Sequence, residues 1–144
     1  MSQPNSSVSK YSASGPMLGF LYQVRVALLW AAKQSVLGDF SLSVETLDDV
    51  SFTNDKDATV VLQTKHSINA QATLSELSTE LWKTLRIWTE GSTSGELPQD
   101  SARFLIATAT VSAGTACAAL TVDPDKRDVE AAGNLLKHAA TTST

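Results

Sequence analysis

The chain contains few of the residues that form disulfides or bind transition metals. Its 144 residues include one cysteine and two histidines. A single cysteine cannot form an internal disulfide, which suits a reducing compartment. The chain also lacks the set of cysteines and histidines that a structural zinc site needs. Cys117 lies among small residues with no histidine nearby, and we interpret it as a small buried residue and not as a nucleophile.

Three further absences narrow the function. The formal net charge is −4, so the composition lacks the basic excess that is typical of nucleic-acid-binding domains. No Gly-rich phosphate loop occurs, so we do not expect the chain to be an ATPase by itself. There is no basic-then-apolar leader and no apolar run of membrane-spanning length, so we expect a cytoplasmic protein without a membrane partner.

The residues that are present fit one globular domain. Hydrophobic residues make up 42% of the chain and charged residues 18%, which is typical of a domain with a real core. The first fourteen residues are rich in serine and predict a flexible tail. We expect the folded domain to span residues 15–140.

Residues 40–67 predict a β-hairpin. Two runs rich in Val, Phe, Leu and Thr flank a polar cluster at residues 54–57, which is the pattern of strand, turn and strand. If the turn centres on Lys56, Asp49 and Gln63 pair across the hairpin, because each lies seven residues from it. A slip of one residue would break this pairing.

Four polar side chains of the hairpin are predicted to share one face of the sheet, because side chains alternate along a strand. They are Glu45, Asp49, Gln63 and Lys65. Two carboxylates and an amide oxygen can hold a hard cation such as Mg²⁺. A neighbouring ammonium can stabilise a phosphate oxygen or an attacking hydroxide, which suits metal-assisted hydrolysis of a phosphodiester. The alternative is a set of solvated residues on an open hairpin face, because short polar motifs often occur by chance.

The motif Asp49…Gln63-Thr64-Lys65 resembles the core of the PD-(D/E)xK nuclease superfamily in its Q-x-K variant. More narrowly, the chain is similar to the N-terminal double-stranded-DNA endonuclease domain of bacterial antiviral effectors, either CBASS-type or associated with defence ATPases. The resemblance covers about residues 15–110. Its other motifs are Gly19-Phe20-Leu21-Tyr22-Gln23, Glu45…Asp49, Gln63-Thr64-Lys65-His66 and Leu81-Trp82-Lys83-Thr84-Leu85…Trp88. The superfamily usually has an acidic residue at the position of Gln63. The amide therefore removes one negative charge from the implied metal site.

The resemblance implies a bacterial endonuclease that hydrolyses double-stranded DNA with Mg²⁺ or Mn²⁺. In this hypothesis Asp49 is the principal metal ligand, and Gln63 supplies a neutral oxygen. Glu45 is a further ligand or orients a metal-bound water, while Lys65 stabilises the nucleophile or the developing phosphate charge. The resemblance also implies a larger protein or complex, as a homo-oligomer or with a sensor or ATPase component. The alternatives are an inactive nuclease-like DNA-binding or assembly module and a purely structural interaction domain.

A long helix is predicted before the hairpin, beginning near Gly15 and Pro16 and ending at Gly38. The residues at helical spacing that we expect to be buried are Met17, Leu21, Val24, Leu28 and Ala31, with Phe20 and Trp30 widening the stripe. Gln23 lies near this stripe. It is either an ordinary helix-surface amide or, as the resemblance implies, a group that supports the catalytic sheet.

A second helix is predicted after the hairpin, from a capping box at residues 73–76 to Gly91. Its expected apolar face is Leu74, Leu77, Leu81, Leu85 and Trp88. Lys83 and Arg86 on this helix either contact a DNA backbone or form its solvated face, which is the interpretation that we favour. His66 directly follows Lys65, so strand alternation sends it to the opposite face of the sheet.

The rest of the chain predicts a buried strand at residues 103–110 and a last helix capped by Asp123, with Pro124 in its first turn. The expected buried face of that helix is Val129, Ala132, Leu135, Leu136 and Ala139. Residues 40–47 and 48–53 form either two strands or one bent strand. The resulting order is the αβββαβ core of the restriction-endonuclease fold, an α/β domain whose mixed central sheet is flanked by helices.

Overall fold

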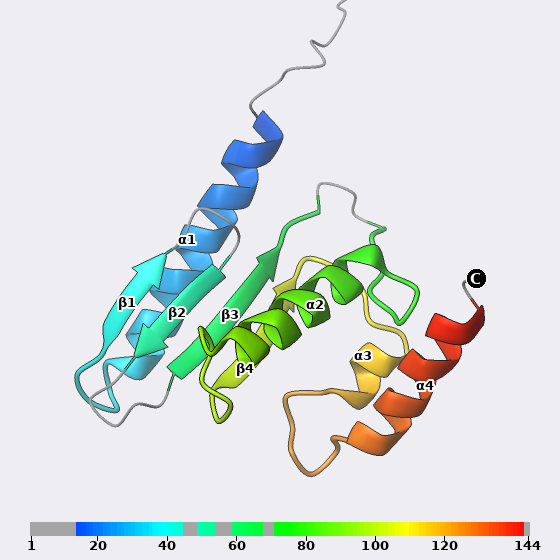
Figure 1. Ribbon diagram of the computed structural model, residues 1–144. Helices are drawn as coiled ribbons and strands as arrows, with labels where there is room; N and C mark the ends of the chain where they lie inside the picture. Colours follow the sequence, from blue (N-terminus) through cyan, green and yellow to red (C-terminus); the bar gives the residue numbers. More distant parts are fainter. Residues whose placement is uncertain (1–13, 45–48, 54–58, 68–70, 143–144) are drawn as a thin grey trace, which may run out of the picture.

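A four-stranded mixed sheet organises the chain, with helices on both of its faces (Figure 1). The structure is a computed structural model and describes residues 14–44, 49–53, 59–67 and 71–142. The elements in chain order are α1 (Ser14–Gln34), β1 (Ser41–Val44), β2 (Asp49–Thr53), β3 (Thr59–Lys65), α2 (Thr79–Ser94), β4 (Ala102–Ala107), α3 (Ala116–Ala119) and α4 (Val129–Thr142). This order confirms the predicted sequence of helices and strands, with α3 in addition. Residues 1–13 of the predicted tail lie outside the described residues, and Ser14 begins α1.

The strands lie in the order β1-β2-β3-β4. β1, β2 and β3 pair antiparallel, and β4 joins β3 in parallel after the crossover through α2. The segment before the predicted turn is therefore two antiparallel strands and not one bent strand. The predicted class, α/β with a mixed sheet flanked by helices, is confirmed.

The register of the hairpin agrees with the sequence prediction. Asp49 pairs with Gln63, and Val50 pairs with Leu62. Leu62 packs against α1 in the core, so Gln63 and Lys65 face the other side of the sheet. That side carries α2, as the ion pair between Lys65 and Glu80 shows. We call the two sides the α1 face and the α2 face of the sheet.

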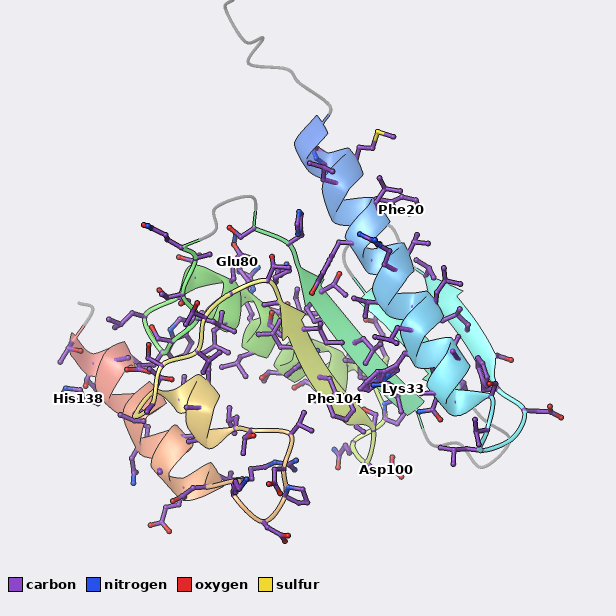
Figure 2. All side chains as sticks on the ribbon, turned by 180° about the vertical axis from the view of Figure 1, so that it is seen from behind. Phe20, Lys33, Glu80, Asp100, Phe104 and His138 are labelled. Carbon is purple, nitrogen blue, oxygen red and sulfur yellow. The ribbon has the colours of Figure 1, made fainter. Side chains whose placement is uncertain are left out.

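The main core lies between α1 and the α1 face. Its buried members are Val26, Ala27, Val50, Phe52 and Leu62. Figures 1 and 2 show α1 crossing this face, with its N-terminal turns projecting beyond the sheet, while α2 covers the other face and α3 and α4 lie beside it. β4 is half-buried rather than buried as expected, because it is an edge strand.

This arrangement predicts different costs for the same substitution at two leucines. Leu62 is fully buried, whereas Leu37 is 80% exposed. Leu62→Ala leaves a cavity in the core, and we expect it to lower the free energy of unfolding by about 2–5 kcal/mol. Leu37→Ala should change it by less than about 0.5 kcal/mol. Chemical denaturation of both variants checks the difference, and equal losses would contradict the placement of the core.

The buried side of α1 was predicted wrongly. The stripe expected to be buried points outward: Met17 is 63% exposed, Leu21 46% and Leu28 64%. The side that packs on the sheet instead carries Val26 and Ala27. Phe20, which was expected to widen the buried stripe, is 52% exposed, whereas Trp30 and Ala31 do pack against the core. The cause is that α1 is apolar on both sides, so periodicity alone does not identify the buried one.

Two helix ends also differ from the prediction. α1 stops at Gln34, and Gly38 lies beyond it with a φ of 133°. Gly91 does not end α2 but lies inside it, where Leu97 packs so closely that an added Cβ would be 2.8 Å from Leu97 Cδ1. α2 continues to Ser94 and ends at Gly95, which has the left-handed conformation that favours glycine.

The predicted starts of α2 and α4 are several residues early. α2 begins after Ser78, whose Oγ accepts a hydrogen bond from Ser75 N (2.9 Å), and Leu77 before it is 75% exposed. Asp128, not Asp123, caps α4 by accepting a hydrogen bond from Ala131 N (2.9 Å). Asp123 instead forms a turn. Within α4, Ala132 and Ala139 are buried as expected, whereas Val129 is 66% exposed.

Candidate active site

A pocket of about 820 Å³ lies at the carboxyl ends of the parallel strands β3 and β4. Three segments form its walls: the N-terminal turns of α1, the strand ends, and residues 72–80 that lead into α2. We call it the strand-end pocket. Ligands of open α/β sheets bind in the crevice outside the carboxyl ends of the strands. The strand-end pocket is therefore the leading candidate for a ligand-binding site.

Lys65 is the last residue of β3 and lines the strand-end pocket. Its side chain is 19% exposed, and its Nζ lies 3.5 Å from Glu80 Oε2. The ammonium is therefore partly desolvated and held at the edge of the pocket by a carboxylate. Lys65 therefore lies at the end of the strand and not in the core.

Glu80 is the pocket carboxylate that the sequence prediction missed. It lies in the first turn of α2, lines the pocket, and binds both Lys65 and Lys83, whose Nζ is 3.2 Å from Glu80 Oε1. In the sequence it resembles an ordinary acidic residue at a helix N-terminus. Only the crossover from β3 to α2 brings it to Lys65.

Gln63 lies deeper than Lys65 on the same face of the sheet. It is completely buried, and Asp49 occupies the register position beside it on β2. Amide and carboxylate oxygens are ligands of the kind that Mg²⁺ prefers, but Gln63 lines neither of the two pockets described here. The side chain of Asp49 and the whole of Glu45 lie outside the described residues. Within the described part of the chain, no three His, Cys, Asp or Glu side chains form a group that could hold a metal ion.

His66 lies on the opposite face of the sheet from Lys65, as predicted. Its ring stacks on Tyr22 of α1 with centroids 5.2 Å apart, and its Nδ1 is 3.3 Å from Thr108 Oγ1. Burial raises the pKa of the Tyr22 phenol. His66 therefore contacts Tyr22 on one side and Thr108, just after β4, on the other. The rest of its side chain is exposed and lines the pocket.

Gln23 is not a helix-surface amide, because it is only 2% exposed. It lies on the sheet-facing side of α1 and reaches the strand-end pocket. It therefore approaches the pocket from the α1 face, whereas Gln63 and Lys65 belong to the α2 face. The structure brings Gln23 and Lys65 to one pocket only because that pocket surrounds the strand ends.

Lys83 and Arg86 lie exposed on α2 and pair with acids of their own helix. Lys83 binds Glu80, and Arg86 Nε lies 3.8 Å from Glu90 Oε1. These geometries are those of a solvated helix surface, which is the interpretation favoured from the sequence.

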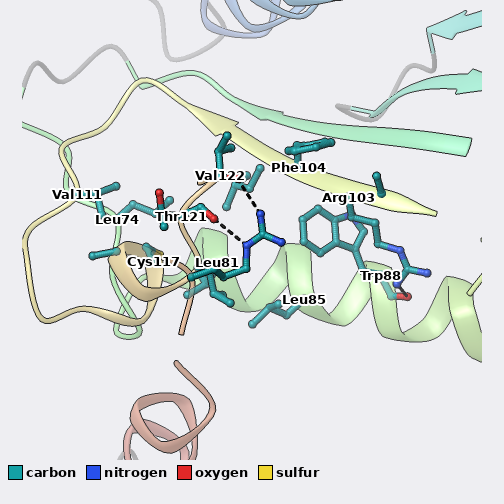
Figure 3. A pocket seen from close by; sticks show the side chains of 15 residues that line it. Leu74, Leu81, Leu85, Trp88, Arg103, Phe104, Val111, Cys117, Thr121 and Val122 are labelled. Carbon is teal, nitrogen blue, oxygen red and sulfur yellow. Dashed lines mark hydrogen bonds between the residues drawn. The ribbon is translucent and has the colours of Figure 1, made fainter. Parts of the chain in front are cut away.

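A second pocket, of about 590 Å³, lies between α2, β4 and residues 111–127 (Figure 3). Its lining is mostly apolar, and Arg127 closes one wall by donating hydrogen bonds to the carbonyl oxygens of Thr121 and Val122. Cys117 lies here, half-buried. Burial, and next the negative charge of Glu76, raise the pKa of its thiol. A raised pKa suits an inert thiol, in agreement with the sequence interpretation.

The comparisons with known proteins give no relative. No protein-family model, no curated protein and no solved structure matches the chain. In addition, none of the helices seen in the described segments has the length and apolar character needed to cross a membrane. Function therefore has to be argued from the strand-end pocket and the hairpin beside it.

Proposed function

We propose that the chain is a metal-dependent endonuclease domain that hydrolyses phosphodiester bonds of double-stranded DNA. The observation that supports it most is the register of the hairpin, which pairs Asp49 with Gln63. Lys65 follows Gln63 by two residues and therefore shares its face. The proposal includes a restriction-endonuclease-like core and, following the resemblance, a role in a bacterial anti-phage defence effector that acts as a homo-oligomer or with a sensor or ATPase component.

The proposed roles combine what the resemblance implies with the register of the hairpin. Asp49 and Gln63 would hold Mg²⁺ or Mn²⁺ from adjacent strands, with Glu45 as a further ligand. When bound, the ion would supply Lewis-acid stabilisation of phosphate charge. Lys65, whose ammonium is partly desolvated, stabilises the attacking hydroxide or the developing charge more strongly than it would in bulk water.

Glu80 holds the Lys65 ammonium in place but is not itself a metal ligand in this proposal. Glu80→Gln keeps the shape and removes the charge. Because the pair is partly exposed and such pairs contribute about 0.2–1 kcal/mol, we expect the cleavage rate to fall by about fivefold at most. The measurement is the initial rate of plasmid nicking at saturating Mg²⁺, with Glu90→Gln as the control on the same helix. Complete loss of cleavage would show that Glu80 acts directly on the metal or the substrate.

One observation favours a second candidate, a catalytically inactive nuclease-like module that binds DNA or assembles a complex. Gln63 is neutral and completely buried, and a neutral ligand binds a divalent cation more weakly than a carboxylate does. The formal charge of −4 also provides no general attraction for DNA.

Plasmid cleavage with Mg²⁺ or with EDTA, combined with a DNA-binding measurement, separates the candidates. Metal-dependent cleavage supports the endonuclease. Binding without cleavage supports the inactive module. Neither activity, measured in the full assembly, would leave a purely structural interaction domain.

A further inference from the structure

The second pocket, between α2, β4 and residues 111–127, has the size and the lining of a small-molecule site. We call it the α2–β4 pocket. Its volume of about 590 Å³ lies within the range of about 300–1,000 Å³ that is usual for ligand pockets, and its mostly apolar lining is also usual for them. Three apolar residues that line it are left partly in water: Val111 is 45% exposed, Leu120 37% and Val122 71%. An apolar ligand would remove such side chains from water, which favours binding.

The charge on the lining of the α2–β4 pocket is positive. Arg103 and Arg127 line it, and no Asp or Glu does, although the whole chain has 15 acidic residues and 11 basic ones. In the described part of the chain neither arginine pairs with a carboxylate. Their hydrogen bonds go to backbone carbonyl oxygens and to the hydroxyl of Ser101. The positive charge of the pocket is therefore available to an anionic ligand.

Arg127 is held in a geometry that suits an anionic group. Its Nε donates to the carbonyl oxygen of Thr121 at 2.9 Å, and its Nη2 donates to that of Val122 at 2.8 Å (Figure 3). Its Nη1 makes no hydrogen bond with the described residues. A guanidinium whose plane is already fixed can bind a carboxylate, sulfonate or phosphate group with little further loss of side-chain freedom.

We propose that the α2–β4 pocket binds a small molecule with an apolar body and one anionic group, and that Arg127 binds the anionic group. The orientation of the ligand follows from the charge at the Cys117 end of the pocket, where Figure 3 also places Leu74 and Val111. Glu76 lies near Cys117, since its negative charge raises the pKa of that thiol. It repels an anion from this end, so the apolar body of the ligand lies there instead.

Two fluorescent probes of nearly the same shape test the role of the charge. 8-Anilinonaphthalene-1-sulfonate is anionic, and N-phenyl-1-naphthylamine has the same rings without the sulfonate. Arg127→Gln should weaken binding of the anionic probe about tenfold or more, because hydrogen bonds to charged groups contribute about 1.5–3 kcal/mol. It should leave binding of the neutral probe unchanged. The matched control is Arg86→Gln, an exposed arginine of α2 that does not line the pocket, which should bind both probes as the wild type does. Unchanged binding of the anionic probe by Arg127→Gln, or an equal loss for both probes, would overturn the proposal.

Cys117 shows whether the anionic probe binds in this pocket or on another apolar surface, such as the exposed side of α1. It is the only cysteine of the chain and lines the pocket, half-buried. The measurement is the rate of alkylation of the wild-type chain by iodoacetamide at alkaline pH, where the reactive thiolate forms. The bound sulfonate probe should slow alkylation in proportion to the occupied fraction of the pocket. Alkylation that is equally fast with the probe bound would place the probe elsewhere and overturn the proposal. Neither readout uses DNA or a metal ion, so both are independent of the proposed nuclease activity.

Discussion

Lys65→Ala is expected to reduce Mg²⁺-dependent DNA cleavage about a hundredfold while the domain stays folded. A fixed positive charge beside developing phosphate charge contributes about 3 kcal/mol, or about two decades in rate. The loss of stability should be no more than about 1 kcal/mol, because the partner Glu80 is 45% exposed and becomes solvated when the lysine is removed. This variant should therefore lose most of its cleavage rate but little of its free energy of unfolding.

Lys65→Arg should fail as well, although it keeps the charge. A planar guanidinium cannot occupy the position of a compact ammonium, and Glu80 at 3.5 Å from Lys65 Nζ would draw it into a two-point ion pair. The control is Lys126→Ala, which also removes a lysine paired with an acid, Asp123 at 3.2 Å, but on an exposed turn. Melting temperature, DNA binding and initial nicking rate should be measured for all three variants. Normal cleavage by folded Lys65→Ala would remove the catalytic role and leave β3 as a structural strand.

Asp49→Asn is expected to abolish metal-dependent cleavage, whereas Glu45→Gln should leave measurable activity. Asp49 is adjacent to Gln63 in the sheet, and an amide in its place would replace the principal carboxylate of the proposed metal position by a neutral ligand and lower its affinity for the metal. Glu45 was predicted two residue pairs further along the hairpin, but the residue before it, Val44, ends β1 and pairs antiparallel with Val50 of β2, and Glu45 itself lies outside the described residues.

The matched control is Asp100→Asn, which lies at the opposite end of the sheet from Glu80 (Figure 2) and should cleave normally. Each variant should be titrated with Mg²⁺, because a site with weakened metal affinity should need a higher Mg²⁺ concentration to reach the same cleavage rate. If folded Asp49→Asn cleaves better than folded Glu45→Gln, the proposed roles of the two carboxylates are wrong.

The hairpin was predictable because two local signals agree. The polar cluster predicts where the turn lies, and the apolar runs on either side predict which strand positions face the core, so the observed pairing of Asp49 with Gln63 could be predicted without tertiary information. The same alternation correctly separated His66 from Lys65. These predictions could be made from local sequence, because every residue involved lies within about ten residues of the predicted turn.

Helix orientation could not be predicted in the same way. α1 is apolar on both sides, and what selects the buried one is the fit of Val26 and Ala27 against Val50 and Leu62 on the sheet, which periodicity does not contain. The start of α2 was missed because Thr73, Ser75 and Ser78 compete as caps. Glu80 was missed because its partner is fifteen residues away and joined to it only by the fold.

The most direct test of the central claim is nicking of supercoiled plasmid by the purified chain at high concentration. Three reactions are compared: wild type with Mg²⁺, wild type with EDTA, and Lys65→Ala with Mg²⁺. The account predicts cleavage in the first reaction, none in the second, and about a hundredfold less in the third. Cleavage that persists in EDTA, or that is equally fast with folded Lys65→Ala, would contradict a metal-dependent active site at the end of β3.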